Sequence, residues 1–173
     1  MYSTIVVGYD ESESSKAALK EASLRVKNRN GKLYLVHAVY FGKEEFAILP
    51  SQMEKRFETG THVCRQAKQE LQAQLGMNGS VESFVCEGEP PEVLIDIAQG
   101  KQADLIALGT YGRKGLKRLL MGSVTSQVIL DAPCDVDPLA QDGAIDIDAA
   151  DPRVGRARLK DVGLELPPLL ERL

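Results

Sequence analysis

The sequence predicts an α/β protein built in three layers, with helices on both faces of a mostly parallel sheet. Short apolar runs rich in β-branched residues alternate along the chain with longer segments whose apolar residues recur every three or four positions. Parallel strands need crossover connections, which are right-handed and usually helical. We therefore expect a parallel sheet of strand order 3-2-1-4-5, either five-stranded or four-stranded with a fifth strand that the sequence leaves open.

The first part of the chain contains two strands and the helix between them. Residues 4–9 form a continuous apolar run, and Asp10 with the serines and glutamates behind it favours a helix start. Residues 14–27 place their apolar side chains on one face, as an amphipathic helix does. Residues 32–40 are again apolar and predict the second strand.

The middle of the chain predicts a long helix, a strand and a further helix. Apolar residues from Met53 to Leu75 keep a helical spacing that is interrupted only by Gly60. Residues 80–86 are expected to form the third strand. The segment Glu89-Pro90-Pro91 then opens a helix, because proline is well tolerated in a first helical turn.

A glycine-rich stretch separates the fourth predicted strand, residues 103–108, from the helix that begins near Ser123. Gly109 and Gly112 follow the strand, and Gly122 stands immediately before the serine. Glycine lets bare backbone amides approach a ligand, and a helix start carries unpaired N–H groups and about half a positive charge. The stretch therefore predicts a phosphate-binding loop that needs no catalytic side chain.

Asp10 marks a second part of the same predicted site. In the expected strand order, a crevice opens beyond the carboxyl ends of the first and fourth strands, where the chain changes its direction of travel across the sheet. Asp10 follows the first of these strands and Gly109 follows the other. Two separate signals therefore predict one binding site.

Size, charge and cysteine content limit the domain organisation and the partners. The chain has 173 residues, which we divide into one α/β domain over residues 1–137 and an atypical extension over 138–173. A net charge of −4 argues against nucleic acid and anionic membranes as partners. The three cysteines have no metal-binding or redox spacing, and no targeting or membrane-spanning segment is evident, so we expect a cytoplasmic protein with reduced thiols.

The glycine pattern resembles that of the universal stress proteins, whose nucleotide-binding members carry G-x2-G-x9-G-(S/T) after the fourth strand. Gly109, Gly112, Gly122 and Ser123 fit this pattern without a gap, and the likeness covers about residues 2–134. It includes the Val-Gly-Tyr-Asp end of the first strand, the Leu-Val-His-Ala end of the second, and the Asp-Ala-Pro-Cys turn after the last predicted helix. The resemblance implies a role in the stress response and binding of ATP, with Mg²⁺ accompanying the nucleotide.

The resemblance also implies roles for single residues. Asp10 would lie near the ribose or a magnesium-bound phosphate, reaching the metal through water, and no side chain is assigned as a direct metal ligand. The backbone of Ala38 would pair with adenine. The predicted nucleotide-binding residues, including one basic residue of the loop, are Asp10, Ala38, Gly109, Gly112, Arg113, Gly122, Ser123, Val124 and Thr125.

Simpler roles compete with several of these assignments. The basic run that begins at Arg113 could be a solvated loop instead of an electrostatic aid to phosphate binding. Ser123 could serve as the N-cap of its helix, and Asp10 could cap the first helix. His37 lies within an apolar strand, so we expect a hydrogen-bonded histidine there and not a catalytic base.

No enzyme motif accompanies the predicted site. The sequence lacks a GxxxxGK(S/T) loop, a GxGxxG motif after the first strand and a GxSxG elbow. The third predicted strand ends in Cys86-Glu87-Gly88, where a receiver domain would need an aspartate. We therefore expect a nucleotide-dependent regulator without catalytic residues. A dimeric interaction scaffold without nucleotide and a slow ATPase are the alternatives.

The likeness breaks after the Ala-Pro-Cys turn. Related proteins usually form a dimer through an apolar fifth strand, whereas Asp135, Asp137 and Pro138 occupy this segment. Proline lacks a ladder donor and unpaired buried carboxylates are costly, so the sequence predicts a poor central strand and an altered homodimer interface. Residues 145–147 could supply a replacement edge strand, and residues 159–173 could dock as short helices.

Overall fold

One mixed sheet forms the centre of the protein. The computed structural model describes residues 2–27, 30–42, 49–76, 80–110, 122–140 and 143–144. The strand order is β3-β2-β1-β4-β5-β6, in which the first five strands are parallel and β6 is antiparallel to β5. The predicted five-stranded parallel sheet of order 3-2-1-4-5 is therefore confirmed. The strands are β1 (Thr4–Gly8), β2 (Lys32–Val39), β3 (Val81–Glu87), β4 (Leu105–Gly109), β5 (Asp135–Ala140) and β6 (Gly143–Ala144).

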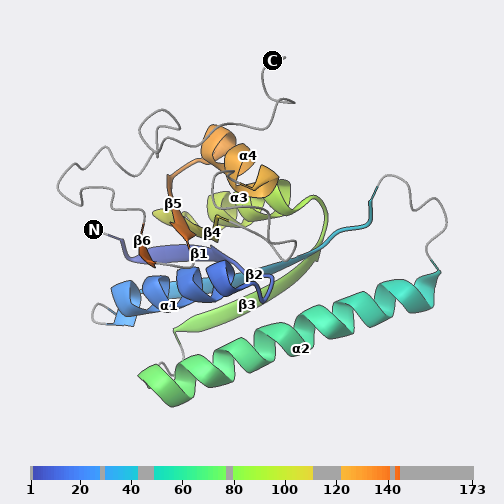
Figure 1. Cartoon of the computed structure of the whole chain (residues 1–173), viewed down its shortest axis with the longest axis horizontal. Helices are drawn as coiled ribbons and strands as arrows, with labels where there is room; N and C mark the ends of the chain where they lie inside the picture. Colours follow the sequence, from blue (N-terminus) through green and yellow to red (C-terminus); the bar gives the residue numbers. More distant parts are fainter. Residues whose placement is uncertain are drawn as a thin grey trace.

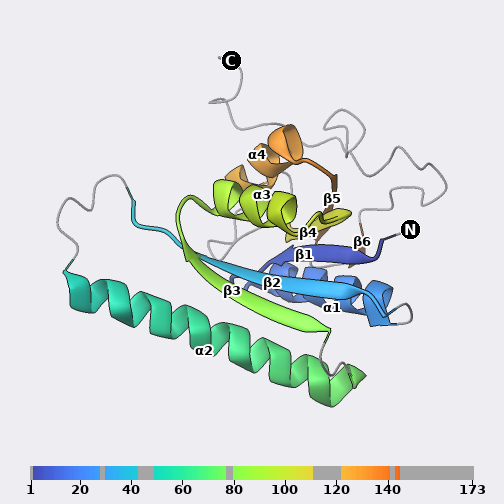
Figure 2. The same cartoon turned by 180° about the vertical axis from the view of Figure 1, so that it is seen from behind.

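The helices cover both faces of this sheet. They are α1 (Glu13–Lys27), α2 (Pro50–Leu75), α3 (Pro90–Gly100) and α4 (Ser123–Asp131). Helices α1 and α2 lie on one face, and α3 and α4 lie on the other (Figure 1, and from behind in Figure 2). Side chains of β1 alternate between the two resulting cores: Ile5 and Val7 pack with α1 and α2, whereas Val6 packs with α3 and α4.

Helix α2 runs without a break through Gly60, where the sequence predicted an interruption. A Cβ atom added to Gly60 would lie 2.8 Å from both His37 Cδ2 of β2 and Val85 Cγ1 of β3. No real Cβ atom packs so closely, so the missing side chain lets α2 approach the sheet. The glycine therefore serves the contact between helix and sheet, at a cost in helix propensity of about 1 kcal/mol.

Strand β5 forms although the sequence predicted a poor central strand, and its two aspartates are both paired. Asp135 Oδ2 accepts a hydrogen bond of 3.0 Å from the Tyr2 hydroxyl, and Asp137 forms an ion pair with Arg25 of α1. These partners offset the cost of removing the carboxylates from water. Both come from distant parts of the chain, so the local sequence pattern could not reveal them.

Pro138 fits into β5 because its backbone nitrogen, which carries no hydrogen, points away from β4. Thr110 N donates to Leu139 O over 2.8 Å, so the backbone groups of Leu139 point toward β4. Successive residues of a strand alternate in direction, which turns Pro138 toward the outer edge, where proline is tolerated. Farther along that edge, β6 pairs with the end of β5 through Ala140 and Gly143.

Two predictions for the C-terminal extension fall outside the described residues. These are the edge strand over 145–147 and the helices over 159–173. Within the part of the chain that the structure describes, no helix has both the length and the apolar character that a membrane span requires.

The three cysteines form no disulfide bond, and Cys64 is buried between α2 and the sheet. Burial raises the pKa of the Cys64 thiol from 9.0 to about 11, because the thiolate is poorly solvated there. The thiol ionises more readily in the unfolded chain. The protonated Cys64 thiol therefore makes its full contribution to the free energy of unfolding below about pH 9, and this contribution is lost as the pH rises through about 11.

We expect the stability difference between the wild type and Cys64→Ala to narrow as the pH rises from about 8 to about 11. At neutral pH the variant should be the less stable protein, because it leaves a small cavity in the core. At high pH the wild type alone must keep a buried thiol protonated. Urea unfolding at several pH values measures the difference, and a gap that stays constant would contradict the assignment.

Candidate functional site

The carboxyl ends of β1 and β4 meet at one edge of the sheet, as the sequence predicted. The two strands pair directly, with Ile5 opposite Leu105 and Val7 opposite Ala107. Asp10 follows β1, and Gly109 is the last residue of β4. On either side of this pair the strand order runs in opposite directions, toward β2 and toward β5. Such switch points are where open α/β sheets bind ligands.

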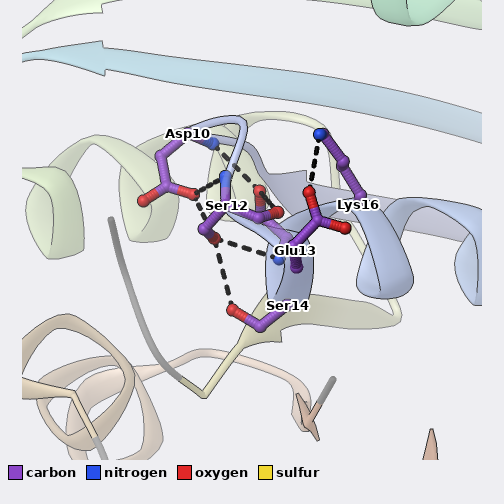
Figure 3. A network of polar contacts seen from close by, with 6 residues as sticks. Asp10, Ser12, Glu13, Ser14 and Lys16 are labelled. Atoms are coloured by element: carbon purple, nitrogen blue, oxygen red, sulfur yellow. Dashed lines mark hydrogen bonds and ion pairs between the residues drawn. The ribbon is translucent and has the colours of Figure 1, made fainter. Parts of the chain in front are cut away.

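Asp10 organises the turn between β1 and α1. Its Oδ1 atom accepts hydrogen bonds from Ser12 N at 3.1 Å and from Ser12 Oγ at 2.6 Å, and Figure 3 shows both. Ser12 Oγ in turn accepts a hydrogen bond from Ser15 N at 3.2 Å, which is the bond of an N-cap. The cap of α1 is therefore Ser12, and Asp10 supports that cap and does not form it.

Gly109 lies directly against the first turn of α1. A Cβ atom added to Gly109 would lie 2.6 Å from Ser15 N and 2.7 Å from the carbonyl carbon of Ser14. Both are backbone atoms, which cannot turn aside as a side chain can. The absence of a side chain at Gly109 is thus required by the packing of α1 on β4, a reason that the sequence pattern did not indicate.

The segment between β4 and α4 is closed at its base by backbone hydrogen bonds. Gly122 N donates to Thr110 O over 2.9 Å, and Thr110 N is bonded to β5 as described above. This base brings the start of α4 beside the end of β4. The intervening residues 111–121 lie outside the described part of the chain, and the predicted binding residues Gly112 and Arg113 are among them.

The first turn of α4 presents backbone amides that no described side chain caps. Gly122 is the N-cap residue and has no side chain to offer, so the alternative in which Ser123 caps the helix is wrong. The Thr125 hydroxyl donates to Gly109 O over 3.0 Å and is therefore used within the protein. The predicted residues Ser123, Val124 and Thr125 supply the N–H groups of this turn, where the helix dipole favours an anion.

Ala38 presents backbone polar groups at the same edge of the sheet. Tyr9 N donates to Val36 O over 2.9 Å, so the backbone groups of Val36 point toward β1. Ala38 stands two residues farther along β2 and therefore points the same way, at a level where β1 has already ended. Its side chain is half-buried. The geometry offers one donor and one acceptor at this edge of the sheet.

The amides at the start of α4 suit an anion, and the backbone donor and acceptor of Ala38 suit a polar group. His37 Nδ1 lies 2.8 Å from Tyr9 O, which agrees with the predicted hydrogen-bonded histidine. Within the described ranges, no cluster of three or more His, Cys, Asp or Glu side chains could hold a metal ion. Any cation at this site would therefore depend on oxygens of the ligand and on single side chains such as Asp10.

Sequence reasoning missed two residues that shape the site. Ser12 caps α1, and the Ser/Glu pattern after Asp10 could have indicated it, although several serines there were equivalent by sequence. Thr110 anchors both the base of the loop and strand β5, through its N–H, its carbonyl and its hydroxyl. No sequence signal would have separated that threonine from an ordinary loop residue.

Comparisons with known proteins agree with this fold. The model of the universal stress protein family matches residues 1–136. The chain is 30% identical over 141 residues to a universal stress protein of Thermus aquaticus, covering 79% of this chain and 97% of that protein. It is 31% identical over 142 residues to universal stress protein MJ0531 of Methanocaldococcus jannaschii, covering 79% and 81%. A universal stress protein solved in complex with cAMP is 26% identical, with a TM-score of 0.61 over 80% of this chain and 96% of that one. The chain therefore belongs to the universal stress protein family.

Proposed function

We propose that this protein binds ATP, accompanied by Mg²⁺, at the crevice beyond β1 and β4, and that it acts in the stress response as a nucleotide-dependent regulator and not as an efficient enzyme. The observation that carries the proposal is the uncapped first turn of α4, held beside the end of β4 by the bond from Gly122 N to Thr110 O. Three backbone amides and a helix dipole at a strand switch point suit a polyphosphate.

We assign residues at this edge of the sheet to the parts of the nucleotide. The amides of Ser123, Val124 and Thr125 would hold phosphate oxygens, and the donor and acceptor of Ala38 would meet the polar edge of adenine. Asp10 follows β1, which lies between β2 and β4 in the sheet, and would face the ribose or the hydrated cation. Magnesium, when bound, would neutralise phosphate charge, while the protein would contribute position and shape.

The solved complex of a related protein with cAMP supports an adenine nucleotide as the ligand class. The triphosphate is the finer part of the proposal, and it rests on the glycine pattern of the sequence together with the uncapped helix start. A regulator of this kind works if the nucleotide binds two shapes or assemblies of the protein with different affinity.

The homodimer implied by the resemblance stays a prediction, with one structural qualification. Pro138 offers no N–H on the outer edge of β5, and Ala140 is already paired with β6. A fifth strand without a proline and without β6 beside it would offer more backbone groups to a strand from a second copy than β5 does.

Two measurements test the proposed ligand. Protein purified without added nucleotide should release adenine nucleotide on denaturation, detected by mass spectrometry. Nucleotide-free protein should bind ATP in calorimetry, and chelation of Mg²⁺ should weaken the binding. If no adenine nucleotide is released and ATP gives no binding heat with or without Mg²⁺, the proposal is wrong and an interaction scaffold becomes the better explanation.

A further inference from the structure

The hydrogen-bond ladder between β1 and β2 ends in an unusual way. The strands are in register up to Gly8 opposite Val36, and Tyr9 N continues the ladder by donating to Val36 O. In a regular parallel ladder, a residue whose N–H bonds to one position accepts, at its carbonyl, the N–H two positions farther along the partner strand. The expected donor to Tyr9 O is therefore Ala38 N.

A side chain takes that position instead. His37 Nδ1 lies 2.8 Å from Tyr9 O, and no backbone hydrogen bond joins Ala38 N to Tyr9 O. Because a carbonyl oxygen only accepts, Nδ1 must carry the proton. We infer that His37 is a positioning residue: its imidazole replaces the Ala38 amide in the β1–β2 ladder and so leaves that amide available to the base of the nucleotide.

Helix α2 holds the imidazole in this place. Gly60 faces the ring so closely that even a Cβ atom would lie 2.8 Å from His37 Cδ2. The ring is thus confined between α2 on one side and Tyr9 O on the other. This confinement gives a second role to the glycine that the sequence had suggested as a helix interruption.

The consequence for the ligand rests on the proposed function. With Tyr9 O already bonded to His37, the N–H of Ala38 remains a donor that points to the β1 side of β2, beyond the end of β1. Adenine offers an unprotonated ring nitrogen at its polar edge, whereas guanine carries a hydrogen at the equivalent position. A fixed backbone donor therefore favours adenine over guanine. The same bond from His37 also fixes the chain immediately before Asp10.

A matched pair of variants separates the hydrogen bond from the bulk of the ring. In His37→Asn the side-chain amide can still donate a hydrogen bond to Tyr9 O. The leucine of His37→Leu is similar to asparagine in size and shape but has no donor. We expect the ATP affinity of His37→Asn to stay within about threefold of the wild type, and that of His37→Leu to fall about tenfold or more. The preference for ATP over GTP should shrink only in His37→Leu. Equal losses in both variants would overturn the inference, because ring packing would then explain them.

Hydrogen exchange of the Ala38 amide in nucleotide-free protein tests the inference independently of ATP binding. The amide should exchange much faster than the ladder amide of Tyr9 in the wild type, and should become protected in His37→Leu, where the ladder can close. An Ala38 amide as protected as Tyr9 in the wild type would refute the inference. If the wild type fails to bind ATP but shows this exchange pattern, the proposed function fails and the role of His37 in the ladder stands.

Discussion

Gly122→Val is expected to weaken ATP binding by about 100-fold or more while the free energy of unfolding changes little. Each charge-assisted hydrogen bond from an amide to a phosphate contributes about 1.5–3 kcal/mol, so the loss of two such bonds produces an effect of this size. Calorimetry with ATP measures the affinity, and urea unfolding of the nucleotide-free protein measures the stability.

The backbone at Gly122 explains why binding and stability should separate. Its φ of −60° and ψ of 149° are open to any residue, so a side chain causes no backbone strain. A Cβ atom there would lie 3.2 Å from Thr110 O, a tight contact that a small adjustment relieves. The two methyl groups of valine would then stand beside the first turn of α4, where the proposed site needs room for phosphate oxygens.

Gly100→Val is the matched control for this experiment. Gly100 ends α3, and a Cβ atom added there meets nothing within 4 Å. The control variant should bind ATP like the wild type. If Gly122→Val also binds ATP like the wild type, the phosphates do not lie at the start of α4 and the proposed site is wrong.

Local patterns in the sequence were sufficient for most of the fold. Apolar periodicity placed the strands and helices within a few residues of their observed bounds, because most segments show one clear face to one core. Strand β5 is the exception. Its aspartates and proline argue against a strand when taken alone, and they become acceptable only through Tyr2, Arg25 and the direction of the missing N–H. These are tertiary contacts, which local sequence patterns cannot predict.

The site shows the same division between local and tertiary information. The sequence predicted that Asp10 and Gly109 follow neighbouring strand ends at one edge of the sheet, and β1 and β4 do pair there. The sequence pattern did not show that the glycines of the motif have different structural roles. Gly122 borders the uncapped start of α4, whereas Gly109 lies against the backbone of α1. Both belong to one motif, yet the structure gives them different physical tasks.

Gly109→Ala is therefore expected to destabilise the fold, by about 1–3 kcal/mol. The single added carbon would lie 2.6 Å from Ser15 N and 2.7 Å from the carbonyl carbon of Ser14. Relief requires the first turn of α1 to move away from β4. That movement would disturb the Ser12 cap and the nearby Asp10, so ATP affinity should fall together with stability.

A comparison with Gly122→Ala shows whether Gly109 is needed for packing against α1 or for contact with the ligand. The two substitutions are chemically identical and lie in the same motif, but only the one at Gly109 forces a Cβ atom into backbone atoms of a helix. Urea unfolding of nucleotide-free protein should show the larger loss for Gly109→Ala, because Gly122→Ala loses only the N-cap preference of glycine, about 1 kcal/mol or less. Equal stability of the two variants would mean that α1 can retreat from β4 at little cost, and the glycine at position 109 would then be needed only for the ligand.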